Sequence, residues 1–188
     1  MDKKELEKNY RAEYFIDEHG EEKVKYVYVG GTYELTAPKN LTLFKVLYCL
    51  FVALTVPAYV LPLCFTCGVI RQVYFTLPYA LQVLAMLYLA WAAVKVVVNN
   101  PPYNEKSRHT IFVYSKVACF AGEILSVGSL IAAAFHIVKN GSTGYDYLAI
   151  AFTALLAALF FAVYIIISCA KLNRIEDPTP SPDQPANE

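Results

Sequence analysis

Four long runs of apolar residues divide the chain, at 46–70, 73–94, 117–138 and 147–170. Each run is long enough to cross about 30 Å of hydrocarbon as a helix of about 20 residues. Inside lipid every backbone polar group must be satisfied, and none of the runs alternates apolar and polar residues as barrel strands do. We therefore predict an all-α bundle of four transmembrane helices, at about 41–68, 74–98, 110–138 and 146–172.

The third predicted helix has one small, polar face and one apolar face. Residues three or four apart place on the small face Ser115, Cys119, Gly122, Ser126, Ser129, Ala133 and His136. The opposite face consists of Val113, Val117, Phe120, Ile124, Val127, Ile131, Ala134 and Val138. Small residues allow helices to approach closely in lipid. We expect this face to organise the bundle, with the third helix at its centre.

Residues 1–40 form a polar segment in which apolar and charged positions alternate. The runs 10–16 and 23–29, separated by a turn-like Asp-Glu-His-Gly, predict a β-hairpin, and Gly30-Gly31 can turn the chain into a third strand at 32–36. Such a small sheet needs a partner to be stable. The predicted partner-binding residues are Tyr10, Tyr14, Tyr26, Tyr28 and Tyr33. Alternatively, the sheet rests on the helix ends or on lipid headgroups, where tyrosine is favoured.

Composition places this architecture in a membrane. Of 188 residues, 57% are hydrophobic, and the mean hydropathy of +0.40 is too high for a soluble domain. The formal net charge of zero gives no indication of a nucleic-acid surface. Residues 41–172 therefore form the membrane domain. Residues 173–188, with four prolines among polar residues, are predicted to be disordered.

Basic residues near the helix ends predict the orientation. With the N-terminus inside, one side of the membrane holds eight of them: Lys39, Lys45, Lys95, Lys106, Arg108, Lys116, Lys171 and Arg174. Only Arg71 and Lys139 lie on the other side. Because cytoplasmic loops carry the excess of Lys and Arg, both termini are predicted to be cytoplasmic. The start of the chain lacks the apolar core of a cleaved signal peptide, so the first helix is expected to act as the anchor.

Glu123 is the one carboxylate within these apolar runs. It lies near the middle of the third helix, where an ionisable group is costly and should face protein or water. Polar residues expected at similar depth are Thr55, Tyr88 and Tyr164, with Ser126 on the same helix. We expect a neutral Glu123 hydrogen-bonded to such hydroxyls; an ion or proton relay is the alternative.

Two cysteines at the outer end of the first helix suggest a second chemistry. Cys64 and Cys67 are three residues apart and Arg71 follows them, an arrangement that can form a redox disulfide. With four helices and both termini inside, this C-x-x-C-x-x-x-R segment resembles the DsbB-like disulfide-forming membrane oxidoreductases. The resemblance implies redox roles for the two thiols. That family carries a second cysteine pair between helices 3 and 4, whereas residues 139–146 contain none.

Other site types receive less support from the sequence. Cys64, Cys67 and His136 are all expected near the outer face, but nothing in the sequence constrains their spacing across two helices, so we predict no metal site. No cofactor motif is present. We therefore predict a non-enzymatic, multi-pass membrane component that binds a protein partner or its own copy. The alternatives are a thiol oxidoreductase using Cys64 and Cys67, and a small transport protein using Glu123.

Overall fold

The computed structural model describes residues 10–16, 22–28, 31–38, 40–65, 67–141 and 144–175. Four helices in it are long and apolar enough to cross a membrane. They are α2 (Leu41–Leu63), α3 (Val73–Val98), α5 (Tyr114–Asn140) and α6 (Gly144–Ser168). A short helix, α4 (Glu105–Arg108), and a π-helical turn, η2 (His109–Val113), extend α5 toward its N-terminus. The four predicted helices are confirmed, although α2 ends before residue 68 and α6 ends before residue 172.

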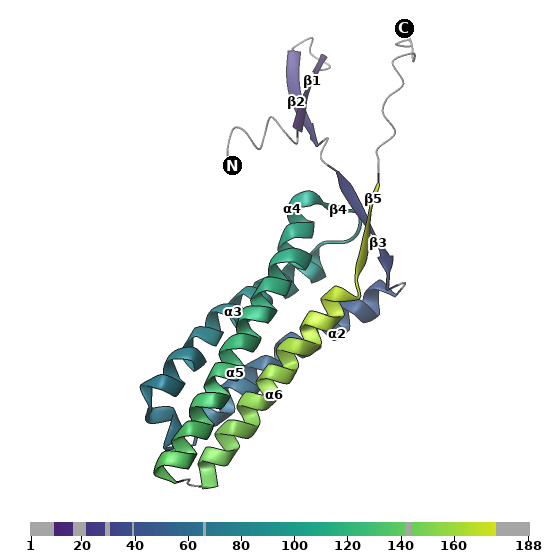
Figure 1. Ribbon diagram of the computed structural model, residues 1–188. Helices are drawn as coiled ribbons and strands as arrows, with labels where there is room; N and C mark the ends of the chain where they lie inside the picture. The colour runs from purple at the N-terminus through teal and green to yellow at the C-terminus, as the bar shows by residue number, and fades with distance from the viewer. Residues whose placement is uncertain are drawn as a thin grey trace.

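The helices form an antiparallel ring in which each packs on two neighbours (Figure 1). α5 lies between α3 and α6, and α2 closes the ring against both of these helices. The buried residues of α5 are Ser115, Cys119, Gly122, Ser126, Ser129, Ala133 and His136, so the predicted small face is confirmed. In a ring of four helices, however, none is central, and α5 occupies a corner.

The described strands form two separate sheets. β1 (Tyr10–Ile16) and β2 (Glu22–Tyr28) pair as the predicted antiparallel hairpin. β3 (Thr32–Ala37) does not continue it. Instead, β3 lies between β4 (Tyr103–Asn104) and β5 (Lys171–Ile175), so the predicted three-stranded meander is wrong. The physical reason is proximity, because the approach to α2, the α3–α4 connection and the exit from α6 all meet at one end of the bundle (Figure 1).

β5 also corrects the predicted C-terminal boundary. Residues 171–172 were expected to be helical and 173–175 to belong to a disordered tail, yet all five form a strand. Leu172 lies opposite Leu35 of β3, and both side chains pack against the apolar core of the bundle. This contact fixes the strand. The remainder of the predicted tail, 176–188, lies outside the described residues, as do Gly30, Lys39 and the predicted turn at 17–20.

We call the end of the bundle that carries β3, β4 and β5 the sheet end. The opposite end, where residues 64–72 join α2 to α3 and Asn140–Gly141 begins the connection to α6, is the loop end. A 3₁₀ turn, η1 (Val69–Arg71), lies within the α2–α3 connection. Because consecutive helices run in opposite directions, each of the four long helices has one terminus at each end.

Candidate functional site

Glu123 is half-buried in the middle of α5. Three of the four hydroxyls expected near it make hydrogen bonds elsewhere. Thr55 donates to the Val52 carbonyl at 2.7 Å, and Tyr88 donates to the Thr110 carbonyl at 3.0 Å. Ser126 donates to the carbonyl of Gly122 at 2.8 Å, and the Tyr164 side chain is exposed on the bundle surface. The predicted polar residues are therefore distributed over the bundle, and the described residues do not form a chain of groups leading through Glu123.

The bundle core holds a polar residue that the sequence analysis missed. Gln82 of α3 is fully buried, and its Nε2 donates to the Ser129 hydroxyl at 3.4 Å. Its Oε1 has no hydrogen-bond partner among the described residues. A lone amide inside the apolar run 73–94 was the signal that could have identified it. This contact joins α3 to the small face of α5.

A buried acidic and imidazole cluster closes the loop end of the bundle. Asp146, in the first turn of α6, is only 1% exposed, and its Oδ1 accepts a hydrogen bond from the Val69 backbone N–H at 3.0 Å. His136 of α5 is also buried, with its Nδ1 2.9 Å from the Tyr74 hydroxyl and 3.1 Å from the Asn140 amide nitrogen. The cluster ties together η1, α3, α5 and α6.

The α2–α3 connection passes close to this cluster at Gly68. A Cβ atom at position 68 would lie 3.5 Å from both Asp146 Oδ1 and His136 Nε2. The two side chains therefore converge on the same point of the connection. The sequence analysis placed His136 near the outer face, whereas it did not identify Asp146 as a site residue. Its position in the first turn of a helix, where acidic residues are favoured, was the available signal.

The two cysteines of the C-x-x-C segment lie in different surroundings. Cys64 is exposed at the end of α2, while Cys67 is buried and its thiol donates to the Tyr145 carbonyl at 3.2 Å. Burial, and secondarily the charge of Asp146, raise the pKa of the Cys67 thiol above its ordinary value. Arg71 is exposed. These surroundings disfavour the reactive thiolate. Within the described ranges, no group of three or more His, Cys, Asp or Glu side chains can hold a metal ion.

The five predicted partner-binding tyrosines fall into two sheets. The hairpin register places Tyr10 opposite Tyr28 and Tyr14 opposite Val24, with Tyr26 also in β2. Tyr14 is 75% exposed and Val24 is 45% exposed, so this cross-strand apolar pair is uncovered. The side chains of Tyr10, Tyr26 and Tyr28 lie outside what the structure describes.

Tyr33 belongs to the second sheet and has a different environment. It is half-buried in β3, and its ring centre lies 4.5 Å from the Arg108 guanidinium carbon. Its register partners are Tyr103 of β4 and Arg174 of β5. Burial raises the pKa of the Tyr103 hydroxyl. Tyr33 therefore stabilises the junction between sheet and bundle and is separate from the exposed hairpin surface.

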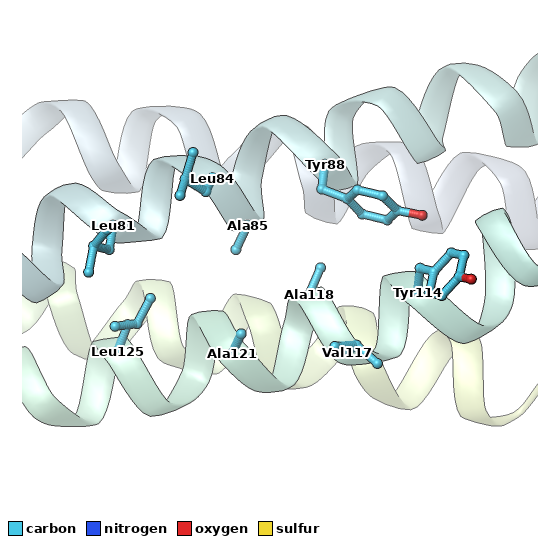
Figure 2. Close-up of a pocket in the computed structure, with 9 residues that line it drawn as sticks. All are labelled: Leu81, Leu84, Ala85, Tyr88, Tyr114, Val117, Ala118, Ala121 and Leu125. Carbon is cyan, nitrogen blue, oxygen red and sulfur yellow. The ribbon is translucent and has the colours of Figure 1, made fainter.

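An apolar groove of about 480 Å³ runs between α3 and α5 on the outer surface of the bundle. Figure 2 shows Ala85, Ala118 and Ala121 in the gap between the helices, with Leu81 and Leu125 toward one end and tyrosines toward the other. The alanines leave space that larger side chains would fill.

Comparison of the chain with known protein families, curated proteins and solved structures found no match.

Proposed function

We propose that this chain is a multi-pass membrane protein that presents its β1–β2 hairpin to a protein partner, and that it is not itself an enzyme. The observation that carries the proposal is the exposed pair formed by Tyr14 and Val24, which lie directly opposite each other in the hairpin. Cross-strand pairs of this type are the stabilising unit of a sheet. Here, the outward side of the pair has no cover within the described chain.

The position of the hairpin supports this role. In the described part of the chain, β1 and β2 pair only with each other, and Figure 1 shows them beyond β3 and β5, apart from the helices. An isolated two-stranded hairpin is marginally stable in water. A partner that covered Tyr14 and Val24 would supply the missing apolar contact.

The orientation of the protein belongs to the same proposal. The basic residues Lys45, Lys95 and Lys106 lie at the sheet end, whereas Arg71 and Lys139 lie at the loop end. By the positive-inside rule, the sheet end faces the cytoplasm. The hairpin is joined to this end through β3. We therefore propose that its partner is a cytoplasmic protein, or a second copy of this chain that meets it on that side.

Site-specific photo-crosslinking in native membranes tests the proposal. A photo-reactive phenylalanine analogue replaces Tyr14 in one variant and Tyr147 in another, because Tyr147 is an exposed tyrosine close to the loop end. We expect a crosslinked adduct from position 14 and none of the same mass from position 147. The chain mass of 21.0 kDa shows whether the adduct contains a second copy or a different protein.

A hairpin substitution supplies the control. Val24→Lys places a charge opposite position 14 without touching the helices, so it should reduce the adduct strongly while membrane insertion is unchanged. Glu34→Lys, on an exposed position of β3, makes a larger positive change in charge outside the hairpin and should still leave the adduct intact. Absence of any adduct at position 14, or an adduct unaffected by Val24→Lys, would contradict the proposal.

A further inference from the structure

A small polar pocket adjoins the apolar groove at the sheet end of the bundle. It encloses about 110 Å³ between the end of α3 and the start of the α4–α5 helix. Its lining includes Lys95 and Lys106 together with the hydrogen-bonding side chains of Asn99, Asn104 and Ser107. Among the residues that the structure describes, no acidic side chain lines it. The pocket thus offers two positive charges and several donors at the level where lipid headgroups meet a membrane protein.

The groove and the pocket meet at Tyr88. The Tyr88 ring lines the groove, and its centre lies 5.6 Å from the ring centre of Trp91, which lines the pocket. Its hydroxyl donates to the carbonyl of Thr110, also in the pocket wall. Thr110 belongs to the π-helical turn η2, and π-helical turns occur frequently at functional sites. One surface therefore leads from an apolar cleft to a small basic pocket.

We propose that this surface binds one anionic phospholipid, with an acyl chain in the α3–α5 groove and the phosphate at Lys95 and Lys106. The groove volume lies within the range of small-molecule sites, which span about 300 to 1,000 Å³. Its position on the lipid-facing surface means that an apolar molecule must occupy it. Basic pockets between transmembrane helices bind anionic headgroups. Charge therefore selects an anionic lipid over a zwitterionic one.

The protein carries its own reporter for this lipid. Trp91 is the single tryptophan of the chain. It lines the pocket, and the Lys95 Nζ lies 5.8 Å from its ring centre. Bromine atoms on an acyl chain quench tryptophan fluorescence at short range, so brominated lipids that bind here will quench Trp91 beyond the level of the surrounding bilayer.

The test uses the full chain in phosphatidylcholine vesicles containing a small fraction of brominated phosphatidylserine or, in parallel, brominated phosphatidylcholine. Fluorescence is normalised to vesicles with the same unbrominated lipids. A lysine near the lipid surface contributes about fivefold to anionic binding. With two lysines, we expect phosphatidylserine to bind next to Trp91 between about fivefold and 25-fold more strongly than phosphatidylcholine.

Two pairs of variants separate a built site from general surface charge. Replacing both pocket lysines, Lys95→Gln with Lys106→Gln, should abolish the preference, whereas Lys171→Gln on β5 at the same end should not. Ala121→Leu fills the groove and should also remove most of the preference. Its control is Val127→Leu, because Val127 is a lipid-facing position of α5 that does not line the groove. The matched controls should retain the preference of the parent protein.

Three kinds of result would overturn the proposal. Equal quenching by the two brominated lipids would show that no anionic lipid is selected. A preference that survives Ala121→Leu, or survives loss of both pocket lysines, would assign it to charge elsewhere on the surface. Native mass spectrometry identifies the competing occupant, because a dimer that Ala121→Leu converts to a monomer would make the groove a contact between two copies of this chain.

Discussion

At the scale of single residues, the packing of α5 on α6 depends on a missing side chain. A Cβ atom on Gly122 would lie 2.8 Å from Cζ of Phe160 and 2.9 Å from two further ring carbons. Phe160 is fully buried, so its ring has little free space into which it can move. Gly128, two turns along the same helix, has no atom within 4 Å of the corresponding position. The two glycines provide a matched comparison.

We expect Gly122→Ala to destabilise the bundle by about 1 to 3 kcal/mol, because overpacking forces a buried ring or a helix to shift. Gly128→Ala should be neutral or slightly stabilising, since alanine is the better helix former. Thermal unfolding of both variants in one detergent measures the difference. Adding Phe160→Leu to Gly122→Ala should recover part of the loss. Equal unfolding temperatures for the two alanine variants would contradict this account of the α5–α6 contact.

Cys67 gives a prediction with a defined pH dependence. Its pKa is raised, chiefly by burial, so the folded protein holds the thiol proton more tightly than the unfolded chain does. The contribution of the protonated Cys67 thiol to the stability of the folded protein is therefore fully present below the ordinary thiol pKa. It is lost as the pH rises through the raised pKa of Cys67. At about pH 8.5, iodoacetamide should therefore modify exposed Cys64 much faster than Cys67.

Peptide mass spectrometry of the alkylated protein measures both rates in the same sample. Unfolding the protein should remove the difference between the two thiols. If Cys67 reacts as fast as Cys64 in the folded protein, the thiolate is accessible. Oxidation of the pair would then regain support, and the oxidoreductase interpretation of the C-x-x-C segment with it.

Some single-residue features were predictable and others were not. The small face of α5 follows from periodicity alone, since every third or fourth residue from Ser115 to His136 is small or polar and all of them are buried. Asp146 could not be found in this way. The burial of Asp146 depends on where the separate α2–α3 connection passes. Its carboxylate accepts a hydrogen bond from the backbone N–H of Val69, which lies far away in sequence.

At the scale of elements, β5 connects the end of the last helix to the start of the first. Five of its residues pair with β3, and Leu172 lies opposite Leu35. Local sequence does not indicate this strand, because Lys171, Asn173 and Arg174 are weak strand formers and prolines follow closely. The ends of α2 and α6 bring β5 next to its partner strand, β3. Pairing with a segment more than 130 residues earlier in the sequence cannot be deduced from local alternation.

We expect a chain truncated after Ala170 to lose most of the protection of β3. Amide hydrogen exchange at Tyr33 and Leu35 should accelerate by about tenfold or more, because the ordering contacts on one side of the strand are removed. Truncation after Ile175 keeps β5 and is the control. The helices should exchange alike in both proteins. Unchanged exchange in β3 after the shorter truncation would show that β5 does not stabilise it.

At the scale of the whole molecule, the up-and-down ring separates two chemically different ends. The sheet end holds Lys45, Lys95, Lys106 and Arg108 beside the strands, whereas the loop end holds the buried Asp146 and His136 contacts. The sequence predicted this division through its apolar runs and charge bias. The surfaces proposed to bind the partner and the lipid both lie at the sheet end. The orientation of the bundle therefore decides on which side of the membrane the protein binds each of them.

Two native cysteines make the orientation testable without introducing new ones. Cys64 is exposed at the loop end, and Cys169 is exposed just after α6 at the sheet end. If the sheet end is cytoplasmic, a membrane-impermeant maleimide applied to intact cells should modify Cys64, and Cys169 should react only after permeabilisation. Mass spectrometry of the modified peptides distinguishes the two sites. Cys64→Ser and Cys169→Ser variants control for assignment. Labelling of Cys169 in intact cells with Cys64 protected would reverse the orientation, and the hairpin would then meet its partner on the non-cytoplasmic side of the membrane.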